Sequence, residues 1–573
     1  MGQSNSTPGN DTSKYEQNLN KIQNKYHNTT EIEEYFLKRA IRHLTTSEFL
    51  SYSVSLNDKK DLNEIYPHQQ LLQKLHVPED NRLLSDIVLK IFKTLSNYPL
   101  INDLQNDASF GGILKAIVLL SPRGKKYVAH KSFNIVTLLF IALSKVGKEN
   151  LLYNTISLNE SYQLNEVLGD YNETNFDEIT VDSEIILCFI TWLLTLNYIC
   201  PTNNCKLNYD IDNDDWKTFE LSAKCIIRSM NTEAFTLTTA PGSMRPITFQ
   251  EFSTVFKVII PNILIGLENL VEHLLYQEKD LVDTERPIDK TAESKLLSKS
   301  LYSQINASLP KEIAITKLQK LYIGRESGFS MRSLQSKVFK WVAPTIVLIS
   351  GMRITDDTEY GSSKNPRYKK FLECYPKLRD DDQHLDECFE RKRKVIFAVF
   401  IKEPWKVTNK SYFGGSNTTI IQLSPRQDIY RSNISNIVYF NTIGGGIGIG
   451  STQPIIKSTL EKHQPGNVAL TIDNSLEFAA FRNVGYGGKL NPSSLQIEKE
   501  TTDRTFELRF IIQDIEVWGC GGEKELEEQI RQLQWEEKEA KRRQHVNLKS
   551  LGEDRALLEM AGLVGQHQSG GSM

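Results

Sequence analysis

The spacing of apolar residues changes once along this chain of 573 residues, and that change limits the fold more than any other feature. Before about residue 275 apolar side chains recur every three or four residues, as in 83–91 and 133–141, which is typical of amphipathic helices. After about residue 310 they form short β-branched or aromatic runs, such as 395–401 and 468–472, separated by Gly, Asn, Ser and Pro. The sequence therefore predicts an α+β protein, with an all-helical N-terminal domain followed by an antiparallel β domain.

The last apolar run indicates how the β domain is built. Every second residue from Phe506 to Ile512 is apolar, and the apolar phase then slips to Ile515 and Val517. Because successive side chains of a strand point to opposite faces, a one-residue slip predicts a bulge near Gln513. Short strands at this spacing favour an antiparallel two-sheet β-sandwich with flanking helices.

Composition and turn signals divide the chain into five segments and one insertion. We predict a disordered polar tail (1–30), a helical domain (31–275), a charged linker (276–294), a β domain (295–522) with a charged insertion (353–394), and a C-terminal helical extension (523–573). Within the helical domain, Thr and Glu lie at capping-box spacing in 45–48 and in 248–251, which predicts two helix starts.

Overall composition opposes several classes of protein. There are 68 Lys and Arg against 71 Asp and Glu, so the net charge is −3, which argues against direct binding of nucleic acid because such domains are strongly basic. The seven cysteines are scattered and odd in number, which fits a reducing cytoplasm better than a disulfide scaffold. The most apolar stretch, Ile185–Cys200, is shorter than the roughly 20 residues that cross a bilayer, so we expect a buried helix there.

The N-terminus fits a lipidation motif. Met1-Gly2-Gln3-Ser4-Asn5-Ser6 matches the N-myristoylation pattern, which makes Gly2 the predicted lipidation site. One myristoyl chain binds a membrane only marginally, and stable anchoring needs a second signal. No basic cluster or cysteine lies nearby, so we expect the second contact to come from a partner already on the membrane.

An acidic segment matches the start of a calcium-binding EF-hand loop. Asp210, Asp212 and Asp214 occupy ligand positions 1, 3 and 5. Position 6, where the turn needs Gly, is Asp215, and position 12, where a bidentate Glu belongs, is Leu221. These losses favour an acidic loop, or a degenerate EF-hand that keeps only its pair of helices, over a metal site.

Two further motifs have both a chemical and a structural interpretation. The segment Gly444–Gly450 lacks the spacing of nucleotide-binding loops and lies among strands, so it predicts a glycine-rich turn or a bulged strand. Cys520 has no histidine in a motif that would activate it, so an inert buried thiol is favoured over a nucleophile. The sequence therefore predicts no catalytic residue, no metal ligand and no cofactor.

The C-terminal extension carries a candidate partner-binding helix. The segment 523–543 has no Gly or Pro and contains several Glu-to-Lys or Glu-to-Arg pairs four residues apart, while Ser550 and Glu553 predict the start of a second, shorter helix. The apolar stripe of the first helix is narrow. The candidate partner-binding residues on it are Leu526, Ile530, Leu533 and Trp535. A long polar helix gains little from lying on its own domain, so we expect it to dock on another protein. The alternative is that the stripe packs back on the helical domain of the same chain.

Residues from about 295 to 522 resemble the TLDc domain. The resemblance rests on motifs in a fixed order: Leu321-Tyr322, Ser327-Gly328-Phe329-Ser330, Pro344–Ile349, Phe397–Phe400 with Glu403-Pro404-Trp405, Tyr412-Phe413-Gly414, Gly444–Gly450 and Ile515–Gly519. The whole chain also resembles fungal TLDc proteins and the myristoylated animal TLDc proteins that carry degenerate EF-hand-like helices. The resemblance implies a two-sheet sandwich, no established catalytic site, and binding to the vacuolar proton-pumping ATPase, whose assembly TLDc proteins modulate. It further implies a link to oxidative-stress resistance and, among fungal members, an influence on telomere capping.

Two functions of different classes follow from these observations. The first is a non-enzymatic regulator that binds the peripheral sector of the vacuolar ATPase, is cytoplasmic, and is held at the vacuolar membrane with the help of an N-myristoyl group. The second is an oxidative-stress protection factor acting through a thiol, for which Cys520 is the candidate. A factor that acts directly on telomeric nucleic acid is opposed by the net charge of −3.

Overall fold

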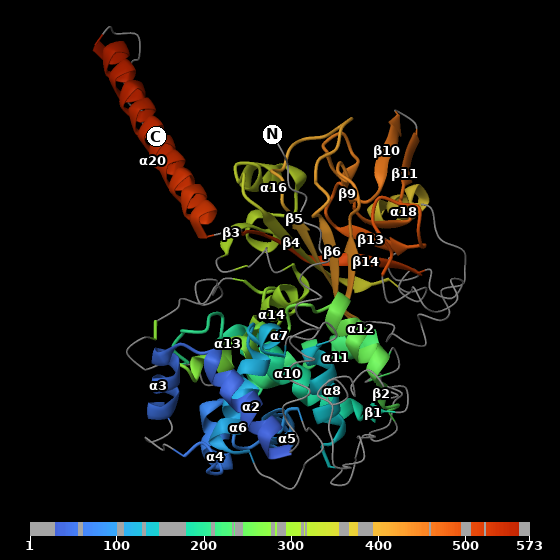
Figure 1. Ribbon diagram of the computed structural model, residues 1–573. Coiled ribbons are helices and arrows are strands. Elements are labelled where there is room, and N and C mark those ends of the chain that lie inside the picture. Colours follow the sequence, from blue (N-terminus) through green and yellow to red (C-terminus); the bar gives the residue numbers. More distant parts are fainter. Residues whose placement is uncertain are drawn as a thin grey trace, which may run out of the picture.

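The computed structural model has a helical region, a β region and a long C-terminal helix that runs away from both (Figure 1). The structure describes residues 29–55, 61–99, 108–128, 133–147, 179–207, 212–231, 234, 244–276, 281–282, 294–310, 315, 318–354, 366–375, 394–457, 460–493, 506–520 and 523–560. The predicted tail and the predicted linker therefore lie almost entirely outside the described residues.

The N-terminal region is helical, as the sequence predicts. Its helices are α2 (Thr29–Arg42), α3 (Thr46–Ser55), α4 (His68–Lys74), α5 (Arg82–Ser96), α6 (Phe110–Leu120), α7 (Gly124–Val128), α8 (Ile135–Ser144), α10 (Ser183–Ile199), α11 (Asn213–Met230), α12 (Phe249–Val258) and α13 (Ile265–His273). A short antiparallel pair, β1 (Thr180–Val181) and β2 (Ile247–Thr248), joins two of its loops. Helix α14 (Lys299–Ser308), which belongs in sequence to the predicted β domain, packs against α10 and α11 of this region.

Helix α10 lies at the centre of this region and contacts α5, α11, α13 and α14. Its side chains are buried almost all round, which confirms the buried helix predicted there. Thr191 and Thr195 are tolerated because each hydroxyl donates to the carbonyl four residues earlier, at 2.7 and 2.8 Å. In the described part of the chain, no helix combines the length and the apolar composition that crossing a membrane requires.

Both predicted capping boxes are present. The amide of Thr45 donates to the Glu48 carboxylate at 2.7 Å, and the amide of Glu48 donates to Thr45 Oγ1 at 3.3 Å, so α3 begins there. Thr248 and Glu251 repeat the arrangement at the start of α12. Each box satisfies backbone donors that the first turn of a helix leaves without a partner.

The β region is one large antiparallel sheet with helices beside it. Its strands are β3 (Gln319–Ile323), β4 (Thr345–Arg353), β5 (Lys394–Ile401), β6 (Thr419–Ser424), β7 (Asp428–Arg431), β8 (Val438–Asn441), β9 (Gly446–Ile449), β12 (Val468–Ile472), β13 (Phe478–Asn483) and β14 (Phe506–Gly519). Hydrogen bonds follow the order β7-β6-β5-β4-β14-β13-β12-β9-β8, and β3 also pairs with β14. A separate hairpin is formed by β10 (Thr452–Lys457) and β11 (Leu460–Gln464), and the flanking helices are α15 (Gly324–Ser327), α16 (Met331–Val338) and α18 (Pro366–Cys374).

Strand β14 requires a correction to the predicted two-sheet sandwich. Residues 506–511 pair with β13, whereas residues 510–519 pair with β4, and the register shifts between Ile512 and Asp514. The shift confirms the predicted bulge. The two layers, one formed by β4 to β7 and the other by β13, β12, β9 and β8, are therefore halves of one hydrogen-bonded sheet. Strand β14 joins them, because a strand of 14 residues with a bulge is long enough to belong to both.

The layer formed by β4, β5 and β6 is buried on both faces. The ring of Phe397 in β5 lies 4.9 Å, between centroids, from that of Phe481 in β13, so one face of this layer meets the other layer. Ala398 and Phe400, on the opposite face of β5, belong to the same hydrophobic core as the helical region. Burial on both faces explains why residues 395–401 form an unbroken apolar run instead of alternating.

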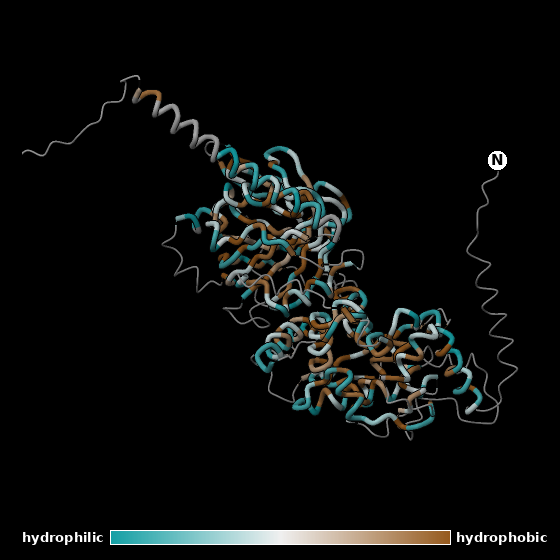
Figure 2. The backbone as a smooth tube through the Cα atoms, turned by 90° about the vertical axis from the view of Figure 1, so that its left-hand side faces the viewer, coloured by the Kyte–Doolittle hydropathy of each residue, from teal (hydrophilic) through white to brown (hydrophobic). Residues whose placement is uncertain are grey.

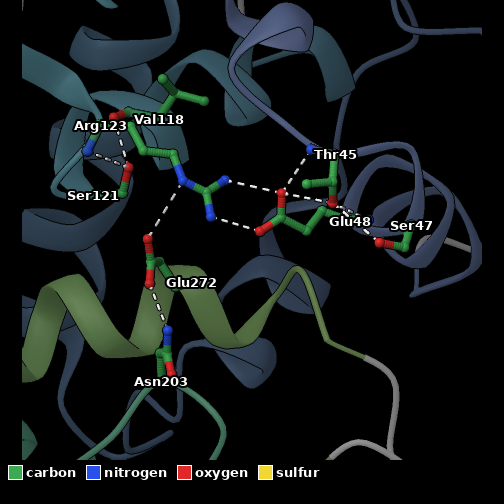
Figure 3. Close-up of polar contacts among 8 residues, drawn as sticks. All are labelled: Thr45, Ser47, Glu48, Val118, Ser121, Arg123, Asn203 and Glu272. Atoms are coloured by element: carbon green, nitrogen blue, oxygen red, sulfur yellow. Dashed lines mark hydrogen bonds and ion pairs between the residues drawn. The ribbon is translucent and has the colours of Figure 1, made fainter. Parts of the chain in front are cut away.

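Arg123, just after α6, ties distant helices together (Figure 3). Its guanidinium contacts both carboxylate oxygens of Glu48, with Nη2–Oε1 at 2.5 Å and Nη1–Oε2 at 3.2 Å. Its Nε lies 3.8 Å from Glu272 of α13, which also accepts a hydrogen bond from Asn203 at 2.8 Å. Burial raises the pKa of Glu48, but hydrogen bonds from Arg123 and Thr45 outweigh it and hold that pKa below its ordinary value. One carboxylate thus caps a helix and anchors a contact between distant helices.

The predicted charged insertion joins two adjacent strands, because β4 ends at Arg353 and β5 begins at Lys394. Between the two strands, the structure describes Ile354 and residues 366–375, which include α18. Phe371 and Tyr375 pack against Phe478 of β13, with 5.7 Å between the ring centroids of Phe371 and Phe478. This part of the insertion is therefore attached to the half of the sheet that contains β13.

Candidate partner-binding surface

Helix α20 (Glu523–Met560) projects beyond the body of the protein (Figures 1 and 2). Its 38 residues correspond to a length of about 57 Å. The sequence predicts two helices here, the second beginning near Ser550, but the structure has one. The predicted cap at Ser550 is overridden and the helix continues through it, because most residues of Glu523–Met560 are good helix formers.

The first turns of α20 contact the chain's own β region through apolar side chains. Ile530 and Leu533 are partly buried against Trp341 and Ala343, in the loop between α16 and β4. Trp341 is fully buried, and its indole Nε1 donates to the carbonyl of Pro344 at 3.0 Å. Two of the predicted partner-binding residues therefore contact the chain itself. We call the surface that they contact, residues 340–343, the Trp341 shelf.

Two polar contacts reinforce this apolar one. The amide of Val342 donates to Oε1 of Gln529 at 3.3 Å, and Lys340 Nζ lies 3.2 Å from the carboxylate of Glu536. Both Lys340 and Glu536 remain substantially exposed, so this ion pair adds little stability by itself. The attachment of α20 is consequently small compared with the length of the helix.

The opposite face of α20 is exposed and partly apolar. Trp535 is 64% exposed, and farther along Leu557 and Met560 are 65% and 88% exposed. At 3.6 residues per turn, Leu557 and Met560 lie within about 40° of Trp535 around the helix axis, whereas Leu533 lies about 160° away. The helix therefore has one face toward the Trp341 shelf and another, marked by Trp535, that faces solvent.

The four predicted residues thus fall on two faces rather than one stripe. Leu526 lies within α20, but its side chain is outside what the structure describes. Ile530 and Leu533 contact the Trp341 shelf, and of the three side chains that the structure describes, only that of Trp535 is mostly free for another molecule. Their role in binding a partner stays a prediction. Sequence reasoning missed the shelf, because nothing local in Trp341-Val342-Ala343-Pro344 indicates that a helix almost 200 residues later covers this loop.

The acidic segment around Asp212 begins a helix. The side chain of Asp212 accepts a hydrogen bond from the amide of Asp215 at 2.7 Å and so caps α11. Asp215 pairs with Lys299 at 2.8 Å, and Asp214 pairs with Lys217 at 3.2 Å. These carboxylates have structural roles, and the EF-hand-like reading of the helical region gains no support from them.

The two remaining motifs have structural explanations. Gly444–Gly450 forms the turn between β8 and β9 together with β9 itself, which confirms the predicted glycine-rich turn. Gly446 has φ +67°, and a Cβ there would lie 2.2 Å from the carbonyl oxygen of Ile472, so a side chain does not fit. Cys520 is 1% exposed, and burial raises the pKa of its thiol to about 12. A thiol so protected is a poor nucleophile, which argues against redox chemistry at this residue.

The comparisons with known proteins agree with this architecture. Residues 290–521 match the TLDc domain family, so the β region with its flanking helices is a TLDc domain. The chain is 48% identical over 553 residues to Restriction of telomere capping protein 5 of Saccharomyces cerevisiae (strain RM11-1a), covering 96% of this chain and 97% of that protein. It is 46% identical over 576 residues to the protein of that name from Kluyveromyces lactis, covering 99% of this chain and 100% of that protein. It is 46% identical over 548 residues to the one from Zygosaccharomyces rouxii, covering 94% of this chain and 96% of that protein. The chain therefore belongs to the Restriction of telomere capping protein 5 family of TLDc proteins. The predicted lipidation site, Gly2, lies outside the described residues.

Proposed function

We propose that this protein is a non-enzymatic regulator that binds the peripheral sector of the vacuolar proton-pumping ATPase and modulates its assembly. It acts from the cytoplasm, as a peripheral protein on the vacuolar membrane. The proposal rests first on the TLDc domain, since proteins with this domain modulate that pump. The name of its relatives adds an influence on telomere capping, which we propose to be indirect because the net charge of −3 offers no general attraction for nucleic acid.

The structural observation that carries the proposal is the solvent-facing side of α20. Trp535, Leu557 and Met560 share one face of a helix whose described side chains contact the body through its first turns. Tryptophan is among the residues that most often dominate binding energy at interfaces. An amphipathic helix that lays such a face into a groove of a partner is a common mode of recognition.

A lipid on Gly2 would add a second, weaker contact. A single myristoyl chain holds a protein at a membrane only marginally, whereas binding to a membrane-attached pump supplies the missing attachment. The two contacts would act together, because attaching one end of the chain raises the effective concentration of the other near the membrane.

Affinity purification from solubilised vacuolar membranes tests the proposal. The tagged full chain is compared with a variant carrying Trp535→Glu, Leu557→Glu and Met560→Glu. A matched control carries Gln532→Glu, Gln534→Glu and Gln544→Glu, which adds the same charge at exposed positions of the same helix. We expect ATPase subunits to co-purify with the full chain and the control and to be lost from the first variant. Failure to recover ATPase subunits with the unaltered chain would overturn the proposal.

A further inference from the structure

A cavity of about 750 Å³ opens on the TLDc domain, and its lining residues lie between Phe329 and Ser475, before α20 in the sequence. Five separate segments meet around it: the start of α16, the start of α18, the loop after β5, the turn between β8 and β9, and the turn between β12 and β13. They contribute, among others, Phe329, Arg332, Arg367, Val407, Thr442 and Ser475. The volume lies within the range of pockets that bind ligands.

The charge of this cavity is opposite to that of the chain. Among the residues that the structure describes, its lining includes two arginines and no carboxylate, in a chain whose net charge is −3. Arg367 pairs with Glu477, whereas Arg332 is exposed and makes no ion pair with the described part of the chain. Lys406, next to the lining residue Val407, is likewise exposed and makes no ion pair within the described ranges.

Two carboxylates close in sequence to the lining residues are occupied in local structure. Glu403 accepts a hydrogen bond from the amide of Gly415 at 2.7 Å. Asp473 accepts from the amides of Ser475 and Phe478 at 3.0 and 2.8 Å, within the turn between β12 and β13. These acids fix loops around the cavity, so Arg332 and Lys406 are left to face the solvent.

The rim of the cavity is also partly apolar. Phe329 and Val407 are 37% and 39% exposed, and Met331 beside them is almost buried. A free inorganic anion would gain nothing from this apolar surface, and a flat membrane surface does not enter a concave site. An apolar side chain flanked by carboxylates matches both properties of the cavity.

We propose that this cavity is a docking site for an acidic peptide segment of a partner protein. An apolar side chain of the peptide sits between Phe329 and Val407, and its carboxylates face Arg332 and Lys406. The site lies on the TLDc domain and uses no residue of α20, so it extends the proposed function with a second and independent contact.

A binding measurement with a defined probe tests this assignment. The probe is a fluorescently labelled peptide of twelve residues, made of Asp and Glu with one central Leu, and binding to the full chain is followed by anisotropy. We expect Arg332→Glu combined with Lys406→Glu to weaken binding about tenfold or more, since two favourable charges become repulsive. Lys257→Glu, at an exposed position of α12, makes the same kind of charge change far from the cavity and should have no effect. Replacing the central Leu of the probe with Gly should also weaken binding.

Three results would overturn the assignment. The first is no binding to the unaltered chain, and the second is equal binding to the unaltered chain and to the Arg332→Glu, Lys406→Glu variant. The third concerns the chain's own acidic tract in the insertion, Asp380-Asp381-Asp382. Binding of the probe only after these three are changed to Asn would assign the cavity to that tract instead of to a partner. Thermal melts of all variants check that folding is unchanged, which we expect because Arg332 and Lys406 are exposed.

Discussion

The carboxylate of Glu516 accepts a hydrogen bond from the indole Nε1 of Trp518, two residues later on β14, at 3.0 Å. The same carboxylate accepts from the hydroxyl of Ser294 at 2.8 Å and from the amide of Leu296 at 3.1 Å, just before α14. Because i and i+2 on a strand share a face, both side chains point toward the helical region, whose core includes Trp518. A fully buried carboxylate with several donors therefore fixes the junction between the helical region and the sheet.

Removing that carboxylate should weaken the junction. Glu516→Ala leaves the buried amides and the Trp518 indole without an acceptor, and we expect the free energy of unfolding to fall by about 3 kcal/mol. Glu516→Gln keeps the shape and one acceptor oxygen, so its cost should be about 1 kcal/mol. Urea unfolding measures both, with Glu528→Ala at an exposed position of α20 as the control. Equal stability of the two Glu516 variants would contradict this account.

Detaching α20 from the Trp341 shelf should loosen the first turns of the helix while the domain stays folded. In the variant with Ile530→Asp and Leu533→Asp, each change removes a half-buried apolar contact worth about 1 kcal/mol. We expect faster amide hydrogen exchange in residues 527–536. Gln532→Asp with Gln534→Asp, at exposed positions of the same turns, should leave exchange nearly unchanged. Identical exchange in the two variants would mean that the shelf does not hold the helix.

Arg123 should be important for the stability of the helical region. Arg123→Met leaves the partly buried carboxylates of Glu48 and Glu272 without their cation, and we expect a loss of about 2 kcal/mol. Since the pKa of Glu48 is lowered in the folded protein, its contribution is present above the ordinary glutamate pKa and is lost as the pH falls through the folded value. The stability difference between the two proteins should therefore shrink on acidification below about pH 4. A difference that stays constant from pH 7 to pH 3 would refute this reasoning.

Lys115 of α6 should make stability rise with pH in the alkaline range. Burial lowers the pKa of its ammonium to about 8, although the negative charge of Glu33 acts to raise it. Its Nζ donates to the carbonyl of Tyr98 at 3.1 Å. Below about pH 8 the cost of burying the charge is present in full. Between about pH 8 and 10.4 the unfolded chain binds this proton more than the folded chain, so the free energy of unfolding rises with pH.

Lys115→Met checks this directly. The variant should be more stable than the unaltered chain at pH 7, by at most about 3 kcal/mol, because the loss of the hydrogen bond to Tyr98 offsets part of the gain. This difference in stability should narrow by pH 10. Urea unfolding at several pH values measures it, and Lys257→Met, at an exposed lysine, serves as the control. Parallel stability curves for Lys115→Met and the unaltered chain would rule out this role of Lys115.

Gly2→Ala should move the protein from membranes to the cytosol without changing its melting temperature. The change blocks N-myristoylation, and it lies outside every contact that the structure describes. Fractionation of cells expressing either form measures the shift. An unchanged membrane fraction would mean that the motif is a coincidence or that protein contacts alone are sufficient.

Local patterns in the sequence were sufficient for the local features of this fold. The capping boxes at Thr45 and Thr248 and the bulge after Ile512 depend on residues within a few positions of one another, and all were predicted correctly. The helical and β regions were also assigned correctly, because apolar periodicity reports which faces of a segment are buried.

The sequence by itself determined the type and order of the elements, and the tertiary structure decided what each buried face meets. The unbroken apolar run of β5 predicts burial on both faces, but not that the helical region covers one of them. The stripe of α20 predicts a contact, but only the fold brings Trp341 beside Ile530 and leaves Trp535 in solvent. Hydrophobic burial is not directional, so a pattern shows that a face must be covered and does not specify which distant segment covers it.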